Sequence, residues 1–191
     1  MTTINAHSLV GSPTRTCWSQ AQSLSNPEQS TSLVLMLKIQ GDEGVVDLSS
    51  IGGAIFEKFH EYGEATHTPL EWRDFVDSEL SEVSQSVERS MIIACLYDDN
   101  VWIFGSGEVS AQLYRNEQFV TLTTSENWNQ GLTGKMQNND TLILGTKWGM
   151  EASQSDGVKE SIRTGLDNFV ETLAPLIHQK TGQAEIALSL L

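Results

Sequence analysis

Apolar residues along the chain gather in short runs that are separated by polar turns. Residues 33–39 are nearly all apolar and have polar neighbours, which favours a buried strand over a helix. Residues 91–123 hold further short apolar runs broken by Asn, Asp and Gly, which is typical of antiparallel strands. Two more apolar runs, at 141–146 and 186–190, predict further strands.

The pattern changes to helical spacing between these runs. A first helix is predicted where apolar residues recur at every third or fourth position, at Ile51, Ile55, Phe59 and Tyr62. A second helix is predicted to begin with a capping box, in which Thr68 is the N-cap, Pro69 the first helical residue and Glu71 its partner. The apolar stripe of this second helix is expected to continue to Val87. A long amphipathic helix is predicted over 156–178.

The order of these elements indicates an α+β fold. Helices that are polar on their outer face must cover a sheet, so either two packed sheets have helices outside them or one sheet has helices on one face. Residues 1–30 are rich in Ser, Thr, Gln and Asn, and we expect this segment to be partly irregular with one short strand near 16–20. Residues 31–191 are expected to form the main domain.

Composition excludes several classes of function. The chain has 191 residues, of which 25 are acidic and 11 are basic, and its net charge of −14 argues against binding a nucleic-acid backbone. The sequence lacks an apolar run long enough to span a membrane and a secretory signal at its start. With only Cys17 and Cys95, a reduced, cytoplasmic protein is expected, and a single disulfide between them is the alternative.

Two segments resemble the PPM-type (type-2C) metal-dependent protein phosphatases. In that family a strand leads into Gly-Asp-Ser-Arg and a second strand that ends near Tyr-Arg-Asn-Gly. Here the corresponding residues are Gly107-Glu108-Val109-Ser110 and Tyr114-Arg115-Asn116. The run Asn139-Asp140-Thr141-Leu142-Ile143-Leu144-Gly145-Thr146 is similar to the family's Gly-Asp-x-Leu-Ile-Leu-Ala-Thr. The resemblance implies a four-layer α-β-β-α sandwich of two antiparallel sheets with outer helices.

The resemblance also implies a metal site, and its acidic ligands are the residues that this chain changes. The family uses two divalent ions bridged by aspartates, because Mg²⁺ and Mn²⁺ prefer carboxylate oxygen. By motif position, Gln40 followed by Gly41 replaces the first Asp-Gly, Lys147 replaces the aspartate of Thr-Asp-Gly, and the terminal Asp-Asn falls near Gly182. In the hairpin motif, Gly107 and Glu108 take the place of Gly-Asp.

Three hypotheses follow. In the first, the metal site has degenerated, no cofactor is bound, and the domain binds a protein or a phosphorylated ligand in a regulatory role. In the second, the chain is a weak Mn²⁺- or Mg²⁺-dependent serine/threonine phosphatase, and Asp42, two residues beyond Gln40, is a weak candidate ligand. Lys147 argues against the second hypothesis, because its positive charge repels a divalent metal ion. The third hypothesis is an unrelated α+β protein, which would have a single sheet.

Overall fold

The computed structural model describes residues 7–26, 31–42, 47–81, 87–122, 131–164, 169, 171–172, 175 and 187–190. These residues form two five-stranded antiparallel sheets. The first sheet has the strand order β1 (His7–Val10), β10 (Ala187–Leu190), β9 (Thr141–Thr146), β6 (Val109–Arg115) and β7 (Gln118–Thr121). The second sheet has the order β2 (Cys17–Asn26), β3 (Thr31–Gly41), β4 (Val87–Tyr97), β5 (Asn100–Ser106) and β8 (Leu132–Lys135).

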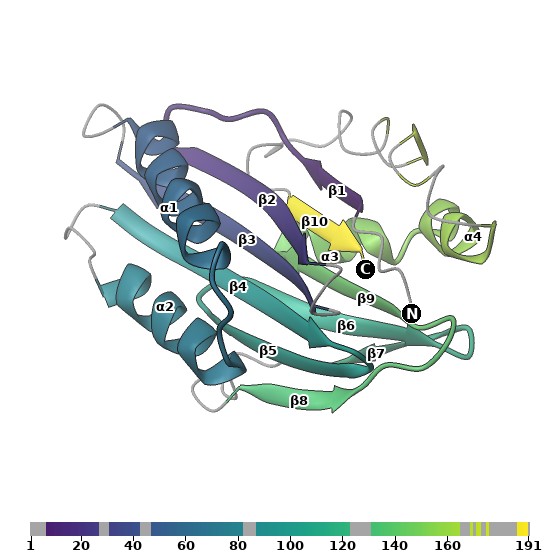
Figure 1. Cartoon of the computed structure of the whole chain (residues 1–191). Coiled ribbons are helices and arrows are strands. Elements are labelled where there is room, and N and C mark those ends of the chain that lie inside the picture. The colour runs from purple at the N-terminus through teal and green to yellow at the C-terminus, as the bar shows by residue number, and fades with distance from the viewer. Residues whose placement is uncertain are drawn as a thin grey trace.

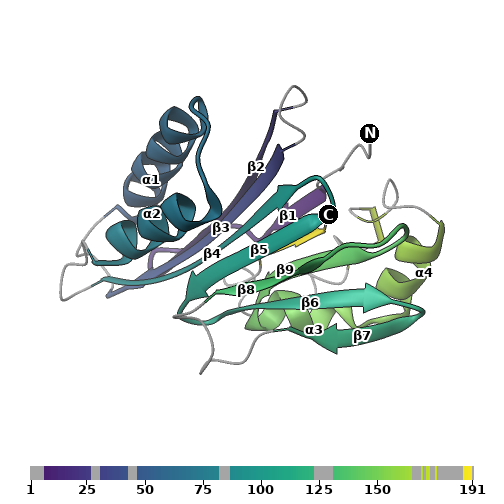
Figure 2. The same ribbon diagram turned by 60° about the horizontal axis from the view of Figure 1, so that its bottom comes forward.

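Helices cover the outer face of each sheet. Helices α1 (Leu48–Gly63) and α2 (Pro69–Ser81) lie on the second sheet, and α3 (Lys147–Ser153) and α4 (Asp156–Thr164) lie against the first (Figures 1 and 2). The result is the expected four-layer α-β-β-α sandwich. The single sheet required by the third hypothesis is wrong, because the strands divide into two sheets with no strand shared between them.

Three apolar clusters fill the spaces between the four layers. Side chains alternate along β3, so Leu33, Leu35, Leu37 and Ile39 pack under α1 and α2. Val34 and Met36 point the other way, into the cluster between the two sheets. A third cluster, with Ile143 and Phe169 among its members, lies between the first sheet and its helices. The uninterrupted apolar run of β3 therefore reflects burial on both faces.

Both helices on the second sheet begin at side-chain caps. The Asp47 side chain accepts hydrogen bonds from the backbone N–H groups of Ser49 and Ser50. Hydrogen bonds from the hydroxyls of these two serines, that of Ser49 first, lower the pKa of Asp47 to about 2. At the start of α2, the Thr68 backbone N–H donates to Glu71 Oε2 at 2.7 Å, and the Glu71 N–H donates back to the Thr68 hydroxyl. The predicted capping box is confirmed.

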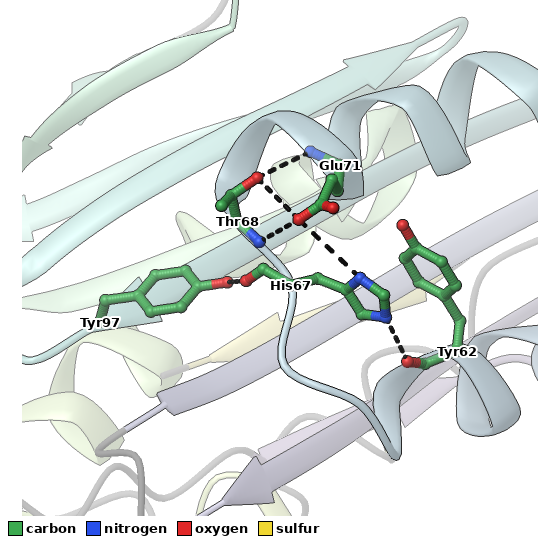
Figure 3. A network of polar contacts seen from close by, with 5 residues as sticks. All are labelled: Tyr62, His67, Thr68, Glu71 and Tyr97. Atoms are coloured by element: carbon green, nitrogen blue, oxygen red, sulfur yellow. Dashed lines mark hydrogen bonds and ion pairs between the residues drawn. The ribbon is translucent and has the colours of Figure 1, made fainter.

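A small polar network fixes the link between α1 and α2 to the sheet (Figure 3). The Tyr97 hydroxyl, at the end of β4, donates to the backbone carbonyl of His67. The His67 ring stacks on Tyr62 with its centroid 3.6 Å away, and His67 Nε2 lies 2.8 Å from the Tyr62 carbonyl oxygen. Because these contacts join the helix pair to β4, they set how the pair lies on the sheet.

The structure differs from the sequence predictions in two places. Strands β1 and β2 lie within residues 1–30, where only a short strand near 16–20 was expected; β2 pairs with β3 along its whole length, from Cys17↔Gln40 to Asn26↔Thr31. As an edge strand, β2 tolerates the polar residues that hid its second half in the sequence. Val87 is in β4 and not in the second helix, which ends at Ser81.

Two predictions are tested in part or not at all. Of the helix predicted over 156–178, the structure describes α4 to Thr164 and helical residues at 169, 171, 172 and 175, and the rest lies outside the described residues. The division of domains at residue 31 stays a prediction.

None of the helices described here is long and apolar enough to cross a membrane.

Two adjacent glycines of α1 test the packing of this helix on the sheet. A Cβ added to Gly52 would meet the Trp18 ring at 2.1 Å, whereas a Cβ on Gly53 would meet nothing within 4 Å. We expect Gly52→Ala to lower the free energy of unfolding by about 1–3 kcal/mol through overpacking. The control Gly53→Ala should raise it by roughly 0.5–1 kcal/mol, because alanine favours the helix. Urea unfolding measures both, and equal effects would contradict the packing described.

Candidate functional site

Polar side chains replace apolar ones at one end of the layer between the sheets. Beyond Met36, the next residue of β3 on this face is Lys38, which is paired in register with Ser19 of β2 and Ser90 of β4. All three residues are buried, as is Thr146 at the end of β9 in the opposite sheet. Buried polar groups need partners, so this end of the sandwich is built differently from the rest of its interior.

A salt bridge between β3 and the turn that links β5 to β6 is the main feature of this site. Lys38 Nζ donates to Glu108 Oε2 at 2.7 Å, across 70 positions of sequence. The Lys38 side chain is 5% exposed, but that of Glu108 is 62% exposed. The hydrogen bond from Lys38 and then its charge lower the pKa of Glu108, and the charge of Lys147 lowers it further. The carboxylate therefore lies in a positive field from two lysines.

The turn before Glu108 is locked against β4. Gly107 has φ +85°, and a Cβ at this position would lie 2.4 Å from Ser90 Oγ and 2.8 Å from Ser90 Cα. Only glycine fits both the backbone conformation and the close approach. The Glu108 N–H also donates to Ser90 Oγ at 2.9 Å. The backbone of the turn is thus held in place, and it directs the Glu108 side chain toward Lys38.

The residues singled out in the sequence lie around this pair. Gln40 and Asp42 are exposed at the end of β3, with the half-buried Gly41 between them. Lys147 is the first residue of α3, immediately after Thr146, and is exposed. The structure brings Gly107 and Glu108 to the same end of the sandwich. Gly182 lies outside the described residues.

The sequence interpretation missed Lys38 and Ser90. The available signal was a single lysine within an otherwise apolar seven-residue run, at 33–39. A buried lysine is rare unless it is paired, so its position in a strand buried on both faces called for an anion from elsewhere in the chain. Nothing in the sequence identified Glu108 as that anion, because the two residues are 70 positions apart and meet only in the folded chain.

A polar pocket lies at the other end of β6. It has a volume of about 380 Å³ and is lined by residues of the β6–β7 turn, the β8–β9 turn and α4. Its arginines are matched by acids of the same pocket: Arg115 donates from Nε to Asp140 Oδ1 at 2.8 Å, and Arg163 pairs with Glu117 at 2.6 Å. These charges neutralise one another, so the pocket offers a ligand little net charge.

Comparison with solved structures identifies the fold. The chain superposes on a serine/threonine phosphatase of S. agalactiae with a TM-score of 0.72 and 11% identity, over 97% of this chain and 96% of that one. The phosphatase Stp1 of Staphylococcus aureus gives 0.70 and 11%, over 99% and 94%. PppA, a regulatory component of T6SS in Pseudomonas aeruginosa, gives 0.64 and 10%, over 97% and 94%.

The chain has the fold of the PPM-type serine/threonine phosphatases. No family model matches the sequence, and no curated protein matches it significantly. The identity to the solved structures is low, so the similarity rests on the order of strands and helices over nearly the whole chain. Whether the chemistry is shared depends on the residues of the site.

The residues described at this end of the PPM fold do not fit a pair of divalent ions. In the described part of the chain, no three His, Cys, Asp or Glu side chains come together as a metal site. The most buried charged group at the site is the ammonium of Lys38, which is a hydrogen-bond donor and cannot be a ligand. Its carboxylate partner, Glu108, is already engaged by that donor.

The pH dependence of stability tests the Lys38–Glu108 pair. The pKa of Glu108 is lower in the folded protein than its usual 4.5, so its charge stabilises the fold above that pH. This contribution is lost as the pH falls through the lowered pKa of the folded state. We expect wild type to be more stable than Glu108→Gln at pH 7, with the difference vanishing in acid, as measured by urea unfolding at several pH values.

The matched control is Glu117→Gln, which removes a solvent-exposed partner of Arg163. Its effect at pH 7 should be smaller, because exposed ion pairs contribute little. A stability difference for Glu108→Gln that stays constant from neutral to acid pH would contradict the described role of the carboxylate.

Proposed function

We propose that this chain is a catalytically degenerate PPM-type phosphatase-like domain that binds a protein or a phosphorylated ligand in a regulatory role. One observation carries the proposal: the Lys38–Glu108 salt bridge, with Lys147 close by, is at the end of the sandwich where two metal ions would need carboxylates. Cationic side chains suit an anionic ligand there, and they oppose a cationic cofactor.

Electrostatics supports this choice. A divalent ion about 4 Å from an ammonium is repelled by roughly 8 kcal/mol at an effective dielectric constant of 20. A set of carboxylates would have to offset that repulsion. Among the motif positions that the structure describes, Gln40 and Lys147 provide none, and the carboxylate of Glu108 is engaged by Lys38. We therefore propose that the domain has no resident metal cofactor.

A specific finding favours a second candidate function. The solved structures that share the fold include serine/threonine phosphatases, and Asp42 is exposed at the end of β3, beside the site. A weak Mn²⁺- or Mg²⁺-dependent phosphoprotein phosphatase that uses Asp42 is therefore the alternative. The two functions differ in whether a divalent ion produces turnover.

The proposed location is the cytoplasm. Cys17 and Cys95 are both buried and form no disulfide with each other, which suits a reducing compartment. Burial raises the pKa of the Cys95 thiol, so this residue belongs to the core and is no nucleophile. The expected partner is a protein or a phosphorylated group, and the acidic charge argues against a nucleic acid.

Hydrolysis assays separate the two candidates. We expect no turnover of p-nitrophenyl phosphate or of a phosphoserine peptide by the wild-type chain, with or without millimolar Mn²⁺, because the described site has no carboxylate set for the ion. The S. agalactiae phosphatase assayed in parallel is the positive control. Mn²⁺-dependent turnover by wild type that disappears in Asp42→Ala would overturn the proposal and establish the alternative.

A further inference from the structure

The Lys38–Glu108 pair is unequal in its burial. The Lys38 side chain is 5% exposed and is fixed within β3, whereas the Glu108 side chain is 62% exposed at the surface of the site. The lysine cannot leave without unfolding its strand. The carboxylate can turn out into solvent by side-chain rotation alone, since the backbone of its turn is held by Ser90. If the pair opens, the carboxylate is the partner that moves.

The groups left behind form a cradle for an oxyanion. Lys38 would present an ammonium from the floor of the site, and Lys147 adds a second positive charge close enough to act on the Glu108 carboxylate. Ser90 accepts from the Glu108 N–H, and its own O–H has no acceptor among the residues that the structure describes, so it can donate. Two cations and a hydroxyl donor are a set suited to phosphate.

We infer that the Lys38–Glu108 ion pair is a self-occupied oxyanion site, in which the Glu108 carboxylate holds the place that a phosphate group of a ligand would take. This inference rests on the proposed binding function. It adds that the Glu108 carboxylate competes with the ligand for Lys38. A ligand must displace Glu108, and the buried ammonium then exchanges one anion for another. In such an exchange the buried ammonium keeps an anion beside it throughout, which suits a buried charge.

The test compares variants for their affinity for phosphate. Isothermal titration with inorganic phosphate, and with a phosphoserine peptide and its unphosphorylated form, is done on wild type and Glu108→Gln at pH 7. We expect Glu108→Gln to bind both phosphate probes about tenfold more tightly, the gain expected when a charged hydrogen-bonded competitor is removed. If inorganic phosphate alone shows this gain, the ligand is a free anion; if the peptide binds better, it is a phosphorylated side chain.

Two further variants identify the cations. Lys38→Met in the Glu108→Gln background should abolish the gain, and it replaces the ion pair by neutral groups of similar size, so no buried charge is left unpaired. Lys147→Gln in the same background affects only an exposed residue, so it tests the cradle even if the first double variant fails to fold. It should weaken phosphate binding severalfold.

The outcomes separate the inference from the proposed function. Equal affinity of wild type and Glu108→Gln for the phosphoserine peptide would overturn the self-occupied site and leave the binding function standing. If both double variants bind phosphate as tightly as Glu108→Gln does, the self-occupied site is also overturned. The two lysines would then not be the groups that recognise phosphate. Failure of every variant to bind either phosphate probe would overturn the site and remove the phosphorylated ligand from the proposed function.

Discussion

The end of the sandwich that holds the site is organised by the need to neutralise one buried lysine. Lys38 continues a strand whose preceding residues on the same face are apolar, and β2 and β4 flank it on both sides. An ammonium in that position is stable only with an anion and hydrogen bonds around it. Glu108 provides the anion from the turn between β5 and β6, at 2.7 Å. The contact therefore ties this turn to β3.

The requirement for Glu108 explains the local sequence. Gly107 allows the positive φ and the close approach to Ser90 that bring the following residue to Lys38. The Ser90 hydroxyl oxygen in turn accepts a hydrogen bond from the Glu108 N–H. In the PPM fold, this end of the sandwich is where carboxylates would hold metal ions. We propose that Lys38 and Lys147 take the place of those carboxylates in this chain.

The sequence predicted most strands and helices because each depends on local patterns, whereas the four layers were implied by the resemblance to the PPM family. The apolar run at 33–39 and the capping box at Thr68 and Glu71 are readable within a few residues, and both are found in the structure. Only the start of β2 was predicted, because the polar composition of this edge strand hid the rest. The site was harder to predict, because Lys38 and Glu108 are 70 positions apart and meet only in the folded chain. The motif positions Gln40 and Lys147 indicated that this chain lacks two aspartates of the family. They did not indicate that Lys38 and Glu108 would form an ion pair nearby.

The most direct test of this account is a crystal structure grown with millimolar Mn²⁺, with anomalous diffraction measured at the manganese edge. The account predicts that Lys38 Nζ remains within hydrogen-bonding distance of Glu108 and that no anomalous peak lies at this end of the sandwich. A strong manganese peak there, held by Asp42 or other carboxylates with Lys38 turned away, would contradict the claim that an internal salt bridge stands where the PPM fold would hold its metal ions.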